Sequence, residues 1–254
     1  MQKKIRASLV HLLISFFLVS SVFAFVLLVC YPGPYFNAMG VGTLLIVLAA
    51  VDVGLGPLIT LIIFNPAKRW LKFELAFVAL MQLSALTYGV VTVFVGRPAY
   101  LVFDENGLFT LVSAYQIPEI ELRKMHYPSL PMTGPKLVGA RIPATKAERK
   151  KYIAEVMEAH VDLPRMLQYH VPYETVIDDV KAKMQPLDKL LKLQSPEKNA
   201  ETKLALGDII SSNRQRVEDL AFVPMTARDR TLTVIVRRSD ASIVKILLID
   251  PLVN

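Results

Sequence analysis

Few residues of this sequence have both the type and the spacing that chemistry requires. Glu158, His160, Asp162 and His170 form a cluster that resembles a set of metal ligands, but their spacing fits no zinc signature. G-x-S-x-G, H-E-x-x-H and phosphate-loop patterns are absent, and the single cysteine, Cys30, has no evident histidine base. The sequence therefore predicts no catalytic, cofactor or metal site, and we expect a protein that is not an enzyme.

The remaining candidate is Asp52, a carboxylate near the middle of an apolar run from Val41 to Phe64. That run is long enough for an α-helix to cross the hydrocarbon core of a bilayer, so Asp52 is expected near the midplane. Ionisable side chains at this depth usually face other helices. Two interpretations stay open: Asp52 fixes helix packing, or it relays protons or ions. Packing is favoured because a relay needs a chain of ionisable groups, and this region has few.

The residues that follow Asp52 favour close helix packing. Asp52, Gly56 and Thr60 recur at i, i+4 and i+8, so they share one helix face, which we expect to look into protein rather than lipid. Pro57 lacks an N–H group, and Gly54 and Gly56 let a neighbouring helix come close. We expect this face to serve helix packing or the docking of a partner helix.

Three elements would position these residues. The chain has 254 residues, of which 53% are apolar, and the excess is concentrated at the N-terminus. Nearly uncharged runs predict transmembrane helices over about 7–30, 41–64 and 75–95. The first run is longer than a signal-peptide core, so we expect a retained helix. The third runs antiparallel to the second, which brings Gln82 and Ser84 to a depth where either side chain could donate a hydrogen bond to the central carboxylate.

Basic residues predict the orientation. All six Lys and Arg of the first 96 residues lie at the extreme N-terminus or in the loop between the second and third runs: Lys3, Lys4, Arg6, Lys68, Arg69 and Lys72. The positive-inside rule places both segments in the cytoplasm. Three crossings then place a second domain, 97–254, outside the cytoplasm and leave 1–96 as the transmembrane region.

The net charge of +7 does not indicate nucleic acid. The first 96 residues carry six basic and two acidic side chains, a net charge of +4. The positive-inside rule already explains these six basic residues. The other 158 carry 23 basic and 20 acidic side chains, only +3, and these are interspersed. A nucleic-acid surface needs a clustered basic stripe. We therefore expect contact with membrane lipid and no nucleic-acid partner.

The second domain has the patterns of an α+β fold with antiparallel strands. One β-hairpin is expected over 100–103 and 108–115 around an Asn-Gly turn, and another over 231–236 and 243–249. Residues 220–223 are expected to add an edge strand that ends at Pro224.

Helix signals lie between these hairpins. Thr145 and Glu148 have the spacing of a capping box, so a helix is expected to follow Thr145. Further helices are expected over 173–184 and from Ser195 onward.

The order of these features resembles the type IV pilin accessory protein family of the TfpX/TfpZ type. The resemblance is carried by the basic N-terminus, the three apolar runs, the stretch VDVGLGPLITLIIF from Val51 to Phe64, and the junction GRPAYLVF from Gly96 to Phe103, with Arg97, Pro98 and Tyr100.

The resemblance implies a Gram-negative inner-membrane protein, and in that membrane the orientation predicted above corresponds to a cytoplasmic N-terminus and a periplasmic C-terminal domain. It also implies a role in type IV pilin assembly or in pilus extension and retraction, with pilin and possibly the assembly machinery as partners. Two other classes stay open. One is a membrane enzyme or transport component that uses Asp52 as a relay. The other is a sensor or scaffold whose exported domain binds an envelope ligand.

Overall fold

The computed structural model describes residues 1–126, 128–193, 196–213 and 216–251. It divides into two compact units, Met1–Arg97 and Pro98–Asn254. Each unit is described by itself below.

The first unit is entirely helical. Its helices, some of which continue one another through π-helical turns, are α1 (Gln2–Phe25) with η1 (Val26–Cys30), α2 (Tyr35–Ala38), α3 (Gly42–Ala49) with η2 (Ala50–Leu55) and α4 (Gly56–Ile63), and α5 (Leu71–Val95). Three continuous stretches, Gln2–Cys30, Gly42–Ile63 and Leu71–Val95, are long and apolar enough to cross a membrane. The three predicted apolar helices are therefore confirmed.

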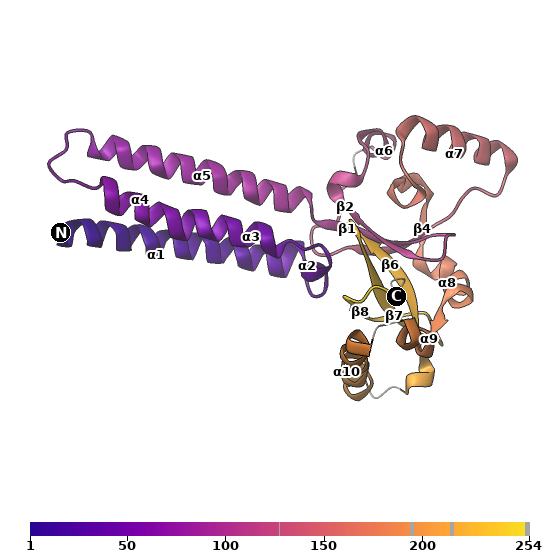
Figure 1. Cartoon of the computed structure of the whole chain (residues 1–254). Coiled ribbons are helices and arrows are strands. Elements are labelled where there is room, and N and C mark those ends of the chain that lie inside the picture. Colours follow the sequence, from indigo (N-terminus) through magenta and orange to yellow (C-terminus); the bar gives the residue numbers. More distant parts are fainter. Residues whose placement is uncertain (127, 194–195, 214–215, 252–254) are drawn as a thin grey trace. The chain divides into compact units, whose positions relative to one another are not determined.

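The second of these stretches lies between the other two. Figure 1 shows α3 and α4 between α1 and α5, and α4 packs against both of those helices. Large apolar side chains cover the outside of the bundle, among them Leu28, Ile46 and Phe73, each about 70% exposed. Patches of this kind are rare on soluble monomers and are typical of surfaces that contact lipid or another protein.

The second unit is built on one mixed sheet. Its strands are β1 (Pro98–Phe103), β2 (Phe109–Ser113), β3 (Lys136–Ala140), β4 (His170–Pro172), β5 (Gln185–Pro186), β6 (Leu220–Ala227), β7 (Arg230–Arg237) and β8 (Ile243–Leu247). The order is β4-β3-β1-β2-β6-β7-β8, and β5 pairs with β6. All neighbours are antiparallel except β1 with β3 and β2 with β6. The predicted α+β class is confirmed, with a sheet that is mostly antiparallel.

Both predicted hairpins are present. β1 pairs with β2 in a register that sets Phe103 opposite Phe109. Gly107 takes a φ of +79° in the connecting turn, a conformation that favours glycine. β7 pairs with β8 as predicted from the C-terminal pattern.

The strand predicted at 220–223 is present, but its predicted position at an edge of the sheet and its predicted end at Pro224 are wrong. β6 runs on through Pro224 to Ala227 and lies inside the sheet, paired with β7 along one side. On its other side it pairs with β5 at Ala221 and Phe222 and with β2 from Met225 onward. Pro224 falls in the gap between those two partners, so its missing N–H group interrupts no ladder on that side.

Helices fill the connections of the second unit. They are α6 (Glu119–Lys124), α7 (Lys146–Ala159), α8 (Ile177–Lys183), α9 (Leu187–Leu193) and α10 (Pro196–Asn213), together with short 3-10 turns such as η5 (Leu167–Tyr169) and η6 (Tyr173–Val176). The predicted cap of α7 is confirmed, because Thr145 Oγ1 accepts a hydrogen bond from the Glu148 N–H at 3.3 Å. The predicted helix over 173–184 is present as the 3-10 turn η6 followed by α8. The helix predicted from Ser195 onward is present as α10, although Ser195 itself lies outside the described residues.

Two apolar clusters hold the sheet to its helices. One includes Val102, Val112 and Val138 of the central strands. The other joins Leu190 of α9 to Phe222 of β6 and includes Ile209, Ile235 and Leu247. Burial of these side chains supplies the main driving force for folding of this unit.

Candidate functional site

Asp52 lies inside the helical bundle, in the π-helical segment η2, with 3% of its surface exposed. Gln82 Nε2 of α5 donates to the main-chain oxygen of Asp52 at 3.4 Å. Asp52 Oδ2 and Gln82 Oε1 have no hydrogen-bond partner among the described residues. π-Helical turns are rare and often occur at functional sites. The π-helical backbone around Asp52 is therefore a second reason to treat this residue as a candidate site.

The expected donor Ser84 is not part of this site. Its hydroxyl donates to the Leu80 carbonyl of its own helix at 2.9 Å, and the residue is exposed. The rotation of α5 about its axis turns Gln82 toward the bundle and Ser84 away from it. Of the two expected donors, only Gln82 bonds to Asp52, and it donates to the main-chain oxygen rather than to the carboxylate as expected.

Two polar contacts from α1 were missed. Ser8 Oγ donates to the Pro57 carbonyl at 2.8 Å, and the His11 ring nitrogen Nδ1 lies 2.6 Å from Thr60 Oγ1. The available signal was the spacing of Ser8, His11 and Ser15 along the first apolar run, which places them on one helix face. These contacts fix the rotation of α1 against α4.

The face that holds Asp52, Gly56 and Thr60 is buried, as predicted. A Cβ atom at Gly56 would lie 2.0 Å from Gln82 Nε2, so the absence of a side chain makes room for Gln82. Pro57 is also buried. This side of the helix is consequently occupied by the chain's own neighbouring helices.

Gly54 differs from Gly56. It is exposed, and a Cβ atom there would meet no atom within 4 Å. It lines an apolar groove of about 660 Å³ between α1 and the second apolar stretch. The groove is lined by Phe16, Val19, Ser20, Phe23, Ile46, Ala49, Ala50, Val53 and Gly54. Small residues four apart, such as Ala50 and Gly54, allow another helix backbone to approach closely.

The predicted junction residues divide between the two units. Arg97 ends the first unit, where its guanidinium lies 4.1 Å from the centre of the Phe94 ring and its Nη1 donates to the Phe94 carbonyl at 2.8 Å. Pro98 and Tyr100 lie in β1, and the Tyr100 ring packs edge-to-face on His170 at 4.9 Å. These contacts are structural, because they join neighbouring elements within each unit.

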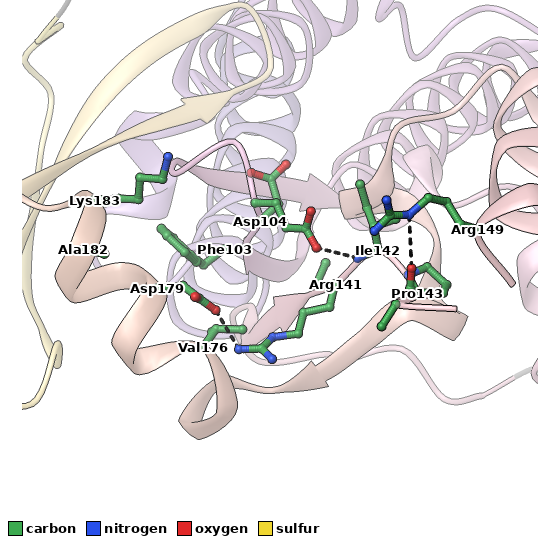
Figure 2. A pocket seen from close by; sticks show the side chains of 13 residues that line it. Phe103, Asp104, Arg141, Ile142, Pro143, Arg149, Val176, Asp179, Ala182 and Lys183 are labelled. Carbon is green, nitrogen blue, oxygen red and sulfur yellow. Dashed lines mark hydrogen bonds and ion pairs between the residues drawn. The ribbon is translucent and has the colours of Figure 1, made fainter. Parts of the chain in front are cut away.

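A cleft of about 620 Å³ lies in the second unit (Figure 2). Arg141 Nη2 donates to the Thr175 carbonyl at 2.6 Å and to Asp179 Oδ2 at 2.7 Å. Glu105 Oε1 accepts from the Ile142 N–H at 3.0 Å. The described lining residues include no Ser, Thr, Cys or His, and their charged side chains at Arg141 and Glu105 are engaged in the hydrogen bonds given above.

A polar network that the sequence did not reveal joins α6, α7 and η5. Lys124 Nζ lies 3.2 Å from Glu121 Oε1 and 3.0 Å from Glu155 Oε1. Tyr169 O–H donates to Glu155 Oε2 at 2.7 Å. Burial and the bond to Glu155 raise the pKa of Tyr169. Although burial acts in the opposite direction, the bonds from Tyr169 and Lys124 lower the pKa of Glu155.

The residues that resembled metal ligands have other partners. His170 Nε2 lies 2.9 Å from the Pro164 carbonyl, and His160 Nδ1 lies 3.2 Å from the Glu158 carbonyl. Asp162 forms an ion pair with Arg165. Within the described residues no group of three or more His, Cys, Asp or Glu could hold a metal ion.

These features define a class of protein: three apolar helices of membrane-spanning length, followed by an α+β domain with a mostly antiparallel sheet. A family model described as "Fimbrial assembly protein FimB" matches residues 1–40. No solved structure matches this chain.

Two curated relatives from Dichelobacter nodosus extend this match. The fimbrial assembly protein of serogroup E1 is 24% identical over 225 residues, which cover 87% of this chain and 86% of the relative. The fimbrial assembly protein of serogroups C1 and C2 is 33% identical over 105 residues, which cover 41% of this chain and 80% of the relative. The chain belongs to the fimbrial assembly protein family, and the resemblance to pilin accessory proteins is confirmed.

Proposed function

We propose that this protein is an inner-membrane accessory factor that assists pilus assembly by contacting pilin. The names of its relatives support a role in fimbrial assembly. The basic residues at the N-terminus and in the loop between α4 and α5 support a cytoplasmic N-terminus and a periplasmic second unit. Reporter fusions after Gly40 and at the C-terminus should behave as periplasmic, and a fusion after Arg69 as cytoplasmic; a cytoplasmic C-terminus would contradict this topology.

The groove beside Gly54 is the proposed docking site for the membrane helix of a pilin. The observation that carries this proposal is the contrast between the two glycines. Gln82 occupies the space beside Gly56, whereas the space beside Gly54 is open. The sequence predicts helix packing or the docking of a partner helix on the face with Gly56 and Pro57; because both residues are buried, we confine the docking proposal to the groove beside Gly54. Helices associate in lipid through close packing rather than a hydrophobic driving force, so a groove that exposes small residues is a suitable surface.

Photocrosslinking in cells tests this proposal. A photoreactive amino acid at Ile46, which lines the groove and is 68% exposed, should form adducts with pilin. The same amino acid at Leu80 of α5 is the matched control, since Leu80 is 60% exposed but does not line the groove. Adducts from Leu80 alone, or none from either position, would contradict docking at Gly54.

A relay at Asp52 is the second candidate. It is favoured by one observation: Asp52 is buried and its Oδ2 has no hydrogen-bond partner among the described residues. A relay predicts that Asp52→Asn removes function at unchanged protein level, because an amide cannot carry the proton. Packing predicts a milder effect, because the amide keeps a polar group of the same shape. Piliation at matched membrane levels distinguishes the two.

A further inference from the structure

A second groove, of about 680 Å³, lies at the N-terminal end of the helical bundle. It is formed by α1, by α4 with Phe64, and by the start of α5. Figure 1 shows the N-terminus and the loop between α4 and α5 at the same end of this unit. The groove is distinct from the one beside Gly54, because the two share no lining residue.

The chemistry of this groove changes along its length. Lys3 and Arg6 line one end, while Ile14, Phe64 and Leu75 supply apolar wall. Lys3 and Ile14 are 11 residues apart on α1, which corresponds to about 16 Å at 1.5 Å per residue. That length is close to half of a hydrocarbon core of about 30 Å, or one leaflet. The groove therefore has the dimensions of a headgroup and one acyl chain.

The positive charge of Lys3 and Arg6, at one end of this groove, is not neutralised by acidic side chains of the first unit. The two acidic residues of the first unit are Asp52 and Glu74, and Glu74 is paired with Lys68 at 2.9 Å. Lys3 and Arg6 have no ion-pair partner among the described residues. An amphiphile with a negative head would supply the missing counter-charge.

We infer that this groove binds an anionic phospholipid, with its phosphate between Lys3 and Arg6 and an acyl chain along the apolar walls. Basic pockets between membrane helices on the cytoplasmic side are known to suit anionic headgroups. The Thr60 hydroxyl and the His11 ring also line this groove, where they lie 2.6 Å apart and bond to each other. The inference does not depend on contact with pilin.

The test compares two lipids on the purified full-length protein. The protein in detergent micelles is mixed with phosphatidylglycerol or phosphatidylcholine of identical acyl chains, and native mass spectrometry measures lipid retention. Each cation near an anionic headgroup contributes about fivefold in affinity. We expect phosphatidylglycerol to be retained about 25-fold more strongly than phosphatidylcholine, and Lys3→Gln with Arg6→Gln to remove most of that preference.

Lys4→Gln is the matched control for charge, because Lys4 does not line the groove. It should keep the preference. Equal retention of the two lipids by the unaltered protein, or an equal loss in Lys4→Gln, would overturn the inference. Glycerol phosphate added in solution should not displace the lipid; displacement at comparable concentration would show a site for free phosphate instead.

A second pair of variants tests the apolar wall without changing charge. Ala79 lines the groove, whereas Ala76 lies on the same helix and does not. Ala79→Leu fills part of the groove and should lower retention of phosphatidylglycerol severalfold, while Ala76→Leu should leave it unchanged. An unchanged retention in Ala79→Leu would contradict an acyl chain in this groove.

Discussion

Gly89 of α5 tests how tightly the helical unit is packed. A Cβ atom at Gly89 would lie 2.4 Å from Leu48 Cδ2, 2.8 Å from Cδ1 and 3.0 Å from Cγ. Carbon atoms pack at about 3.5–4.0 Å, so Gly89→Ala forces Leu48 or the helices to move by about 1 Å. Rotation about χ2 does not move Cγ, and Leu48 is buried. The substitution must therefore strain the interface between α3 and α5.

The magnitude follows from two opposing effects. Overpacking a core costs about 1–3 kcal/mol. Alanine gains about 0.5–1 kcal/mol over glycine inside a helix. We expect Gly89→Ala to lower the free energy of unfolding by about 1 kcal/mol. Gly54→Ala is the control: its Cβ meets no atom within 4 Å, so it should be neutral or stabilising.

Unfolding of the protein in micelles by titration with SDS measures these differences. A double-mutant cycle with Leu48→Ala isolates the clash, because shortening Leu48 makes room for the new methyl group. We expect a coupling energy of about 1–2 kcal/mol between the two positions. Equal destabilisation by Gly89→Ala and Gly54→Ala, or no coupling to Leu48, would refute the packing described here.

Three further predictions concern the second unit. Tyr169→Phe removes the 2.7 Å bond to the Glu155 carboxylate, so it should lower the free energy of unfolding by about 1.5–3 kcal/mol in urea titrations; a loss below about 0.5 kcal/mol would contradict the network. Burial raises the pKa of Tyr173 from 10.0 to about 12, so the folded state favours the neutral phenol. Its contribution is complete below pH 10 and is lost as the pH rises toward 12. A pH titration of stability should therefore show a smaller loss over this range in Tyr173→Phe than in the natural protein, and an equal loss would contradict the burial of Tyr173. Gly139→Ala would place a Cβ 2.5 Å from Val176 Cγ1 and should destabilise this unit by about 1–3 kcal/mol in the same assay; an unchanged midpoint would refute the close contact between β3 and η6.

The fold could be predicted wherever a local pattern decides the structure. Uninterrupted apolar length identifies the three helices, and the Asn-Gly turn identifies the β1–β2 hairpin. The central place of β6 could not be predicted, because Pro224 normally indicates an edge. β6 lies between β7 on one side and β2 with β5 on the other, and its pairings with β2 and β5 join strands that are distant in sequence.

The candidate site was only partly predictable for a related reason. Hydropathy gives the length of a membrane helix but not its rotation about its axis. Gly54 and Gly56 are two residues apart, so they point about 200° apart on a helix, and packing decides which of them is open. The contact between His11 and Thr60 likewise depends on the rotation of α1 against α4.

Co-purification of pilin with Gly54 variants tests the central claim most directly. Gly54→Leu fills the groove between α1 and the second apolar stretch, whereas Gly54→Ala leaves most of it open. At matched membrane levels, we predict that Gly54→Leu loses most of the bound pilin and most surface pili, while Gly54→Ala keeps both. Undiminished pilin binding by Gly54→Leu would contradict docking in this groove.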